Sequence, residues 1–333
     1  GSSLKKTKKS VKQITNRQMR ISVIIPAYNE SMVIKNTIDE VIGILNRLDI
    51  KEYEIIIIDD HSSDGTFELI RSLNNKKVIC YRLSRRSGSH TALRAGMFYS
   101  KSDVVLCLAA DGQDNTDCLG AMMGKWRGGK KIVWALRNDR KNEGWFIHLP
   151  AKLFYRILLL LIGAKNINVD FSRADFFLLD RSVVDAINKC RERNTSLLGL
   201  IAWLGFSQDT VKYDRQMRLA GVSKWTFRSR MRLAKDWILA FSGIPLKLAS
   251  FFGFFFAITG FLYAIYVFLN AIVGRIPPTG WSSLIIIILF LGGIQMIMLG
   301  IIGDYLWQNL DESRQRALFF IESTTEEKEH NLN

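Results

Sequence analysis

Two apolar runs in this sequence end on acidic residues, and these acids are the side chains best suited to chemistry. Residues 54–60 read Glu-Ile-Ile-Ile-Ile-Asp-Asp, and residues 104–114 read Val-Val-Leu-Cys-Leu-Ala-Ala-Asp-Gly-Gln-Asp. Apolar runs of this length predict buried strands. In an open parallel sheet, ligands bind outside the carboxyl ends of the strands, so we expect these acids to face a substrate. Carboxylates beside a phosphate also indicate a divalent metal.

Strand-like and helix-like stretches that could position these acids alternate along residues 20–214. The sequence predicts strands at 21–25, 55–58, 78–81 and 104–108, and helices at 32–48, 67–73 and 90–100. This alternation is typical of βαβ units. The predicted fold class is therefore α/β, with a mainly parallel sheet.

Three segments that follow predicted strands carry polar side chains. Residues 26–30, Pro-Ala-Tyr-Asn-Glu, offer an aromatic ring and a carboxylate, which suit a nucleobase. In residues 59–66, Asp64 could cap the next helix while Asp59 or Asp60 faces the ligand. Residues 111–114, Asp-Gly-Gln-Asp, place oxygen ligands around a glycine that permits a sharp turn. Hard oxygen donors of this kind suit Mg²⁺ or Mn²⁺ bridging a diphosphate.

Together, residues 22–30, 58–66 and 110–114 resemble the family 2 glycosyltransferases with a GT-A nucleotide-sugar fold. Residues 218–224, Arg-Leu-Ala-Gly-Val-Ser-Lys, look like the Arg-x-x-Gly-x-Ser-Lys motif of one branch of that family. This branch contains dolichol-phosphate mannose synthase and the bacterial polyprenyl-phosphate glycosyltransferases. Residues 174–181 are similar to its Gly-Asp-Phe-Arg-Leu segment, and residues 303–316 to the tail of its bacterial two-span members. The resemblance covers nearly the whole chain from Arg20 onward.

The resemblance implies a role for each site residue. Five residues would line the base and ribose of the donor: Pro26, Tyr28, Glu30, Ile58 and Asp60. Ala110, Asp111 and Arg137 would also contact the nucleotide sugar, with Arg137 reaching its phosphates. The metal, Mg²⁺ or Mn²⁺, would be held on the diphosphate by Asp111, Gln113 and Asp114.

Two cations and one acid complete the implied site. Arg218 and Lys224 would lie on a loop over the site and bind the diphosphate or the lipid phosphate, since arginine binds phosphate bidentately and lysine supplies a point charge. The alternative is that both belong to a basic patch facing the membrane. If a general base acts, Asp175 is the candidate, with Asp170 behind it. A structural role for Asp175 is the alternative.

This sequence departs from the family pattern at two places. The metal strand commonly ends in Asp-x-Asp, but Ala109 occupies the first acidic position, so one expected oxygen ligand is absent. In the segment similar to Gly-Asp-Phe-Arg-Leu, Ala174 and Phe177 replace a glycine and an arginine. The first departure predicts either weaker metal binding or a site completed by Asp114 and water.

Two long uncharged stretches, residues 248–273 and 276–303, predict transmembrane helices. Each exceeds the roughly 20 residues needed to span a bilayer, whereas buried helices of a soluble core rarely lack a polar face for so long. Basic residues crowd the segment before the first stretch, while Arg275 alone stands between the two. The positive-inside rule then places both termini in the cytoplasm. Residues 225–246 mix aromatic and basic residues and read as an interfacial amphipathic helix, or as an ordinary surface helix.

We therefore expect five segments. Residues 1–19 form a basic, disordered N-terminus with no cleavable signal peptide; 20–214 form the GT-A domain; 215–246 form an active-site loop and amphipathic helices; 247–306 form two transmembrane helices; and 307–333 form a cytoplasmic tail. The glycines of the second span would permit the close helix packing of a homo-oligomer.

The composition indicates that the protein binds an anionic partner. The net charge of +15 predicts nucleic acid, a membrane surface or a phosphorylated substrate as partner. Nucleic acid is disfavoured because the cations gather beside the span instead of lining a groove. The four cysteines lack metal-ligand spacing, so we expect reduced thiols in a domain facing the cytosol.

The expected function is transfer of a hexose from a nucleotide-diphosphate sugar, taken to be UDP-linked, to a polyprenyl phosphate, taken to be undecaprenyl phosphate. Transfer would invert the anomeric centre at the cytoplasmic face of the bacterial inner membrane and give a lipid-linked sugar for cell-envelope glycan modification. Two alternatives stay open. A processive polysaccharide synthase would need more than two spans and commonly carries Gln-x-x-Arg-Trp, which this sequence lacks. A catalytically inactive scaffold with the same fold is the second, on account of Ala109.

Overall fold

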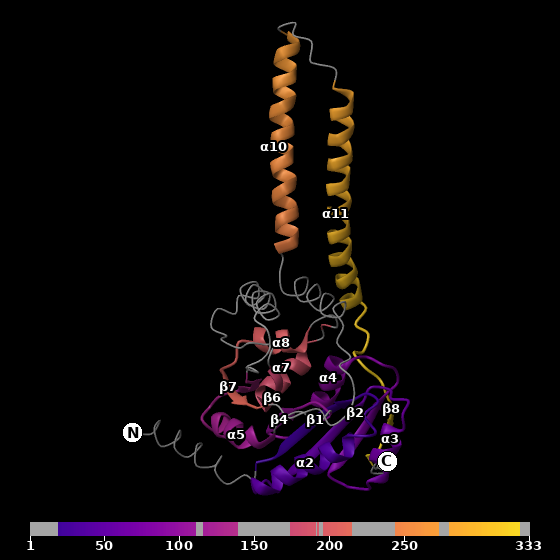
Figure 1. The fold of residues 1–333 in the computed structure, drawn as a ribbon, viewed down its shortest axis with the longest axis vertical. Helices are drawn as coiled ribbons and strands as arrows, with labels where there is room; N and C mark the ends of the chain where they lie inside the picture. Colours follow the sequence, from indigo (N-terminus) through magenta and orange to yellow (C-terminus); the bar gives the residue numbers. More distant parts are fainter. Residues whose placement is uncertain are drawn as a thin grey trace, which may run out of the picture. The chain divides into compact units, whose positions relative to one another are not determined.

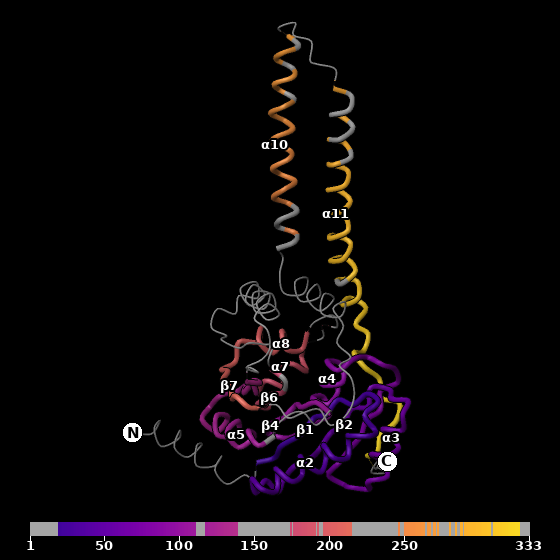
Figure 2. Tube along the Cα trace, in the orientation of Figure 1, coloured from indigo at the N-terminus to yellow at the C-terminus, as the bar shows by residue number. Residues whose placement is uncertain are grey.

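The computed structural model describes residues 19–110, 116–138, 174–190, 192, 196–214, 244–272 and 280–326. The chain divides into two compact units (Figures 1 and 2). One unit holds the α/β sheet, and residues from 317 onward belong to it. The other contains two long helices.

An eight-stranded sheet organises the first unit, in the order β7-β5-β6-β4-β1-β2-β3-β8. The strands are β1 (Ile21–Ala27), β2 (Tyr53–Asp59), β3 (Val78–Leu83), β4 (Val104–Cys107), β5 (Ile132–Arg137), β6 (Ala174–Asp180), β7 (Gln208–Tyr213) and β8 (Ile321–Thr324). Among these described strands, β6 and β8 are antiparallel to their neighbours, while the others share one direction. The prediction of a mainly parallel α/β sheet is confirmed.

Helices connect these strands, and the first three of them were predicted from the sequence. In chain order the helices are α2 (Ile34–Arg47), α3 (Thr66–Ser72), α4 (Ser89–Tyr99), the short 3₁₀ helix η1 (Thr116–Cys118), α5 (Leu119–Arg127), α7 (Arg181–Lys189) and α8 (Leu197–Trp203). The four predicted strands and three predicted helices each end within about two residues of the observed bounds, a normal error for element boundaries. None of the four cysteines, all of which lie in the described part of the chain, forms a disulfide, in agreement with the expected thiols.

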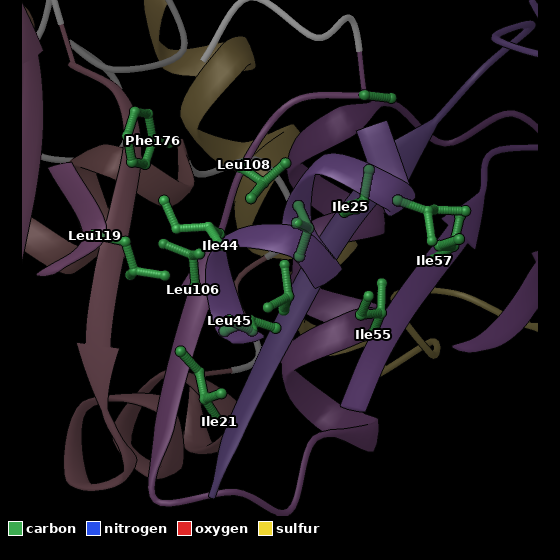
Figure 3. Close-up of a cluster of buried hydrophobic side chains, with 14 of the residues drawn as sticks. Ile21, Ile25, Ile44, Leu45, Ile55, Ile57, Leu106, Leu108, Leu119 and Phe176 are labelled. Atoms are coloured by element: carbon green, nitrogen blue, oxygen red, sulfur yellow. The ribbon is translucent and has the colours of Figure 1, made fainter. Parts of the chain in front are cut away.

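The central strands β1, β2 and β4 are buried on both faces of the sheet, which is why they are mainly apolar runs without polar alternation. On one face, Ile21, Ile25 and Ile55 pack with Ile44 and other residues of α2, α3 and α5 (Figure 3). The alternate residues point to the other face. There α4 approaches β1 so closely that a Cβ on Gly96 would collide with the side chain of Ile24. Because helices cover both faces of the sheet, a ligand can reach it at the ends of its strands.

The second unit consists of α10 (Ile244–Ile272) and α11 (Trp281–Ser313). Each contains a window long and apolar enough to cross a membrane, Ser250–Val267 and Phe290–Ser313, and neither window is buried inside the structure. Large apolar side chains such as Phe254 (68% exposed) and Met296 (72% exposed) therefore need an apolar surrounding. These observations support the two predicted transmembrane helices, although α11 starts at Trp281 and not at residue 276.

After α11 the chain rejoins the sheet domain. β8 pairs antiparallel with β3, and Thr325 N donates a hydrogen bond to Cys80 O at 2.9 Å. The sequence predicts a tail at residues 307–333, so β8 is an element that the prediction does not include. Residues 196–225 and 317–333, which come before and after the helical unit in sequence, both belong to the sheet unit.

Candidate active site

The carboxyl ends of the central strands place Asp59, Asp60 and Ala110 at one edge of the sheet. β1 lies between β2 and β4, and all three are parallel. The chain goes from β1 to β2 and β3 on one side, and then to β4 on the other side of β1. This reversal is the topological switch point at which open α/β sheets bind ligands. The segments after β1, β2 and β4 therefore meet at the position expected for a substrate.

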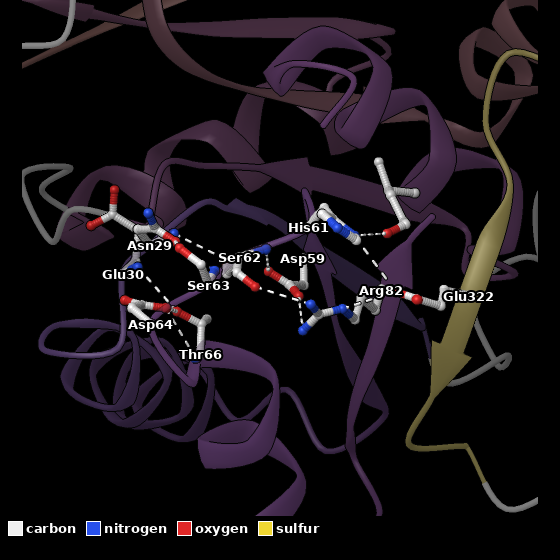
Figure 4. A network of polar contacts seen from close by, with 11 residues as sticks. Asn29, Glu30, Asp59, His61, Ser62, Ser63, Asp64, Thr66, Arg82 and Glu322 are labelled. Carbon is white, nitrogen blue, oxygen red and sulfur yellow. Dashed lines mark hydrogen bonds and ion pairs between the residues drawn. The ribbon is translucent and has the colours of Figure 1, made fainter. Parts of the chain in front are cut away.

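The loops that follow β1 and β2 are joined by hydrogen bonds (Figure 4). Asn29 N donates to Ser62 Oγ at 2.9 Å, and Ser63 N donates to Asn29 Oδ1 at 2.9 Å. Asn29 and His61 adopt left-handed backbone conformations, with φ of 54° and 61°. Such angles are uncommon outside glycine and persist where surrounding contacts fix them. The two loops thus form one ordered ledge at the edge of the sheet.

Asp64 makes structural hydrogen bonds within these two loops. Its Oδ1 accepts a hydrogen bond from Thr66 N, the first residue of α3, and its Oδ2 accepts one from Ser31 N. The N-cap of α3 is Gly65, so the predicted capping role of Asp64 is wrong, and the acid instead ties the two loops together. Burial alone would raise the pKa of Asp64, but the hydrogen bonds from Thr66 and Ser31 outweigh it and hold the pKa below its ordinary value. These contacts keep Asp64 ionised as a structural acid.

Asp59 and Asp60 lie side by side but have different surroundings. Asp59 is fully buried, and its Oδ1 accepts a hydrogen bond from Ser62 N at 3.1 Å. Asp60 is 4% exposed, and its two oxygens accept hydrogen bonds from Ser87 N at 2.6 Å and Gly88 N at 2.8 Å. Burial raises the pKa of both carboxyl groups, against the lowering effect of these hydrogen bonds.

Asp60 therefore holds the segment between β3 and α4 against the end of β2. This segment includes Arg86, whose guanidinium carbon lies 4.0 Å from the centroid of the Tyr28 ring. The same guanidinium lowers the pKa of Asp60, in part offsetting burial. Cations at this distance from an aromatic face are attracted to it. Tyr28, Asp60 and Arg86 thus form a mixed aromatic and charged surface that suits a nucleotide.

Arg86 is not among the predicted site residues. A signal for it exists in the sequence, because residues 85–88, Arg-Arg-Ser-Gly, follow the predicted strand at 78–81 by a few residues. Cations that follow a strand, like acids, lie at the edge where an open α/β sheet binds ligands.

The other predicted nucleotide-sugar contacts differ in exposure. Pro26, Tyr28 and Glu30 are partly exposed at the ledge. The Ile58 side chain is fully buried within the sheet, so contact with a ligand there would involve its backbone. Ala110 is 5% exposed, and its carbonyl oxygen accepts a hydrogen bond from Thr37 Oγ1 of α2 at 3.0 Å. This bond fixes the chain just before the predicted metal ligands.

Arg137 and Asp175 come to the same edge from strands further along the sheet. Arg137 is the last residue of β5, which runs parallel to β4. β6 runs antiparallel between them, so its first residues, Ala174 and Asp175, lie at that edge as well, with Ala174 opposite Leu136. The structure therefore brings Tyr28, Asp60, Ala110, Arg137 and the backbone of Asp175 to one edge.

Several predicted residues lie outside the described part of the chain. These are the metal ligands Asp111, Gln113 and Asp114, the loop cations Arg218 and Lys224, and Asp170. The basic N-terminus before residue 19 and most of the amphipathic segment 225–246 lie outside it too. Among the residues that are described, no group of three or more His, Cys, Asp and Glu side chains could hold a metal ion. The edge described here thus supplies nucleotide contacts, and its metal ligands stay a prediction.

Comparison with known protein families gives two matches. Residues 22–187 match the family model described as glycosyl transferase family 2. Residues 244–308, which contain most of α10 and α11, match the model described as GtrB C-terminal hairpin. The first match includes the strand-end segments of the candidate site, and the second coincides with the apolar hairpin.

Relatives are similar over almost the whole chain. An uncharacterized glycosyltransferase of Bacillus subtilis, YkcC, is 36% identical over 93% of this chain and 95% of its own length. The bactoprenol glucosyl transferase of Shigella phage SfV is 32% identical over 92% of this chain and 99% of its own. The prophage bactoprenol glucosyl transferase homolog of Escherichia coli is 32% identical over 91% and 98%.

Proposed function

The chain belongs to glycosyl transferase family 2, and from this premise we propose that it transfers a hexose from a UDP-linked sugar to undecaprenyl phosphate. The observation that carries the proposal is the extent of the likeness to bactoprenol glucosyl transferases. It spans both the sheet domain and the apolar hairpin, as it would if donor site and membrane anchor served one reaction. The enzyme is membrane-bound, and the expected product is a lipid-linked sugar for glycan modification of the cell envelope.

The donor would bind across the ends of β1, β2 and β4. Tyr28 with Arg86 would contact the nucleobase, and Asp60 the base or ribose, because these groups share one surface at the switch point. Pro26, Glu30 and the backbone of Ile58 would complete the nucleoside pocket. Arg137 at the end of β5 would reach the phosphates, for which an arginine fork is suited.

The chemistry proposed is a single displacement. An oxygen of the lipid phosphate attacks the anomeric carbon, the bond from that carbon to the nucleoside diphosphate breaks, and its electron pair leaves with the diphosphate. A phosphate nucleophile is already ionised at neutral pH, so it needs a general base less than an alcohol acceptor would. Asp175 is proposed as the base, if the reaction uses one, and the position of its backbone at the start of β6 supports this. Arg218 and Lys224 are proposed to bind the lipid phosphate or the leaving diphosphate.

A divalent cation, Mg²⁺ or Mn²⁺, is proposed to be held by Asp111, Gln113 and Asp114. Their carboxylate and amide oxygens fit the preference of these ions. When bound, such an ion neutralises charge on a departing diphosphate. The hydrogen bond from Thr37 Oγ1 of α2 to the carbonyl oxygen of Ala110, the residue before these ligands, supports the proposal.

The sheet domain is proposed to face the cytoplasm of a bacterial cell, at the inner membrane. The cluster of cations before α10 and the single cation between the spans support this orientation. We also propose the division into a GT-A domain at 20–214, a juxtamembrane segment at 215–246 and a hairpin at 247–306. A homo-oligomer stays a prediction.

The test is to incubate the purified chain with undecaprenyl phosphate, Mg²⁺ or Mn²⁺ and a panel of nucleotide sugars, and to detect lipid-linked sugar by mass spectrometry. We expect product with at least one UDP-hexose, and none with Asp111→Asn. Absence of product with every donor would refute the proposal. Activity of Asp111→Asn near that of the wild type would refute the proposed metal site.

A further inference from the structure

The chain segment that follows α11 reaches the loops of the candidate donor site. β8 covers the edge of β3, with Thr324 opposite Tyr81 and Ser323 opposite Arg82. Glu322, on this strand, accepts a hydrogen bond from Arg82 Nε through its Oε2 at 3.1 Å (Figure 4). Its Oε2 also lies 3.5 Å from His61 Nδ1 in the loop after β2.

Arg82, which binds Glu322, also contacts the loop after β2 and a buried acid. Its Nη2 donates a hydrogen bond to the carbonyl oxygen of Ser62 at 3.0 Å. Its Nη1 lies 3.5 Å from Oδ2 of the fully buried Asp59, an oxygen without a hydrogen-bond partner among the described residues. A buried carboxylate needs a compensating charge, and Arg82 supplies it. The guanidinium is thus shared by an acid from β8, a buried acid of β2 and the backbone of the next loop.

Ser62 connects this arrangement to the predicted nucleoside pocket. Its N–H is bonded to Asp59 and its carbonyl to Arg82, so both of its backbone polar groups are fixed. Its hydroxyl then accepts a hydrogen bond from Asn29 N, in the loop that carries Tyr28 and Glu30. A continuous path of contacts therefore runs from Glu322 through Arg82 and Ser62 to Asn29.

We propose that Glu322 is a positioning residue for the sugar-nucleotide donor, acting through Arg82 and Ser62 on the loop of residues 28–30. The inference rests on the proposed function, because it assigns a role to the tail in the same donor site. It makes β8, the strand that follows the membrane hairpin in sequence, part of the apparatus that binds donor.

β8 has other anchors that do not involve Arg82. Glu326 Oε2 accepts a hydrogen bond from Tyr81 Oη at 2.6 Å, and Cys80 N donates to Thr325 Oγ1 at 2.8 Å. The ring of Phe319 lies against those of Phe98 and Tyr99, with centroids 5.9 and 6.2 Å away. Loss of the Glu322 charge should therefore leave the strand in place. Glu326 supplies a matched control, since it is a carboxylate of the same tail that contacts a different residue.

The test compares Glu322→Gln with Glu326→Gln in the full-length chain. UDP binding is measured by calorimetry, and steady-state kinetics give separate KM values for donor and acceptor. We expect Glu322→Gln to raise the Kd for UDP and the KM for donor about threefold, the scale of a half-exposed ion pair. The acceptor KM and the melting temperature should match the wild type. Glu326→Gln should change none of the binding constants.

A second variant removes the guanidinium fork and keeps the charge. Arg82→Lys should raise the Kd for UDP about tenfold, because one ammonium cannot reach Glu322, Ser62 and Asp59 together. Adding Glu322→Gln to this variant should have no further effect, since residues of one network are not additive.

The positioning role and the proposed function fail in distinguishable ways. If the wild type binds UDP and Glu322→Gln binds it equally well, the positioning role is wrong and the proposed function stands. The positioning role would also be wrong if Glu326→Gln weakened UDP binding as much as Glu322→Gln does. The same holds if Glu322→Gln raised the acceptor KM as much as the donor KM. If the wild type binds no nucleoside diphosphate of any base, the proposed function and the positioning role fall together.

Discussion

Replacement of Asp60 by asparagine should separate donor binding from stability. The carboxylate is 4% exposed and accepts hydrogen bonds from Ser87 N at 2.6 Å and Gly88 N at 2.8 Å. Asparagine keeps one acceptor oxygen, but its amide group would face the second N–H donor. The segment that carries Arg86 would then be held by one neutral hydrogen bond in place of two bonds to a charged group.

The two energetic effects have opposite signs for stability. A hydrogen bond to a charged group contributes about 1.5–3 kcal/mol, and one is lost. Burial raises the pKa of Asp60 above its ordinary value of 3.8, so the stability this group contributes is present below that value and is lost as pH rises through the folded pKa. Asparagine has no charge to bury at neutral pH, which offsets the lost bond. We expect the stability at pH 7 to change by no more than about 1 kcal/mol.

Donor binding has no such compensation. If the nucleoside bonds to Asp60 as proposed, the loss of a charged acceptor costs about 1.5–3 kcal/mol, or about ten- to a hundredfold in Kd. Calorimetric titration of UDP into the full-length variant measures this change. Asp39→Asn, an exposed acid of α2, is the matched control for the change in charge and should bind UDP like the wild type. UDP affinity of Asp60→Asn within twofold of the wild type would refute the assignment of Asp60 to the donor site.

Three further substitutions test other parts of the structure. Gly96→Ala should destabilise the sheet domain by about 1–3 kcal/mol, because the added Cβ would collide with the side chain of Ile24. Gly43→Ala is the control: its Cβ would meet open space on α2, so this variant should be stabilised by up to about 1 kcal/mol. Equal melting temperatures for the two variants would contradict this packing. Asp180→Asn should cost about 2 kcal/mol at neutral pH, since the carboxylate caps α7 and accepts hydrogen bonds from Lys131 and Trp126. Burial raises the pKa of Asp180, but hydrogen bonds from Ser182, Trp126 and Lys131 outweigh burial and lower the pKa. The contribution of Asp180 to the free energy of unfolding is therefore present above the ordinary pKa of 3.8 and is lost as pH falls through the folded pKa. Denaturant melts at pH 3 to 7 should show a smaller loss of stability in acid for the variant, and an unchanged pH profile would count against this reading. Ala109→Asp restores the missing acid of the metal strand and should lower the concentration of Mn²⁺ needed for half-maximal activity about tenfold; an unchanged metal titration would show that position 109 does not face the ion.

Much of the sheet domain could be predicted because its parallel strands are buried on both faces. The run at 55–58 is apolar without interruption and the run at 21–25 is apolar apart from Ser22, and they lie within β2 and β1. The same reasoning could not find β8. Its residues, Ile-Glu-Ser-Thr, are few and mostly polar, and its partner β3 lies about 240 residues away in sequence. The order of strands was equally inaccessible, since it depends on contacts between distant segments.

The candidate site was predicted in part for the same reason. Acids at strand ends follow from the sequence alone, so Asp60 and the segment leading to Ala110 were expected at the edge. Whether a given acid faces a ligand or the interior depends on tertiary contacts. Asp59 and Asp64 carry the same functional group as Asp60, yet one is buried beside Arg82 and the other is bonded to Thr66 and Ser31. Position in the motif could not separate these roles.

The central claim is that a lipid phosphate receives a single sugar. It is tested most directly by incubating the wild-type chain with its best nucleotide sugar and three acceptor mixtures: undecaprenyl phosphate, undecaprenol without phosphate, and no lipid. Mass spectrometry of the lipid fraction should show one added hexose with undecaprenyl phosphate alone. Equal transfer to undecaprenol, a ladder of added sugars, or no product in any mixture would contradict the account.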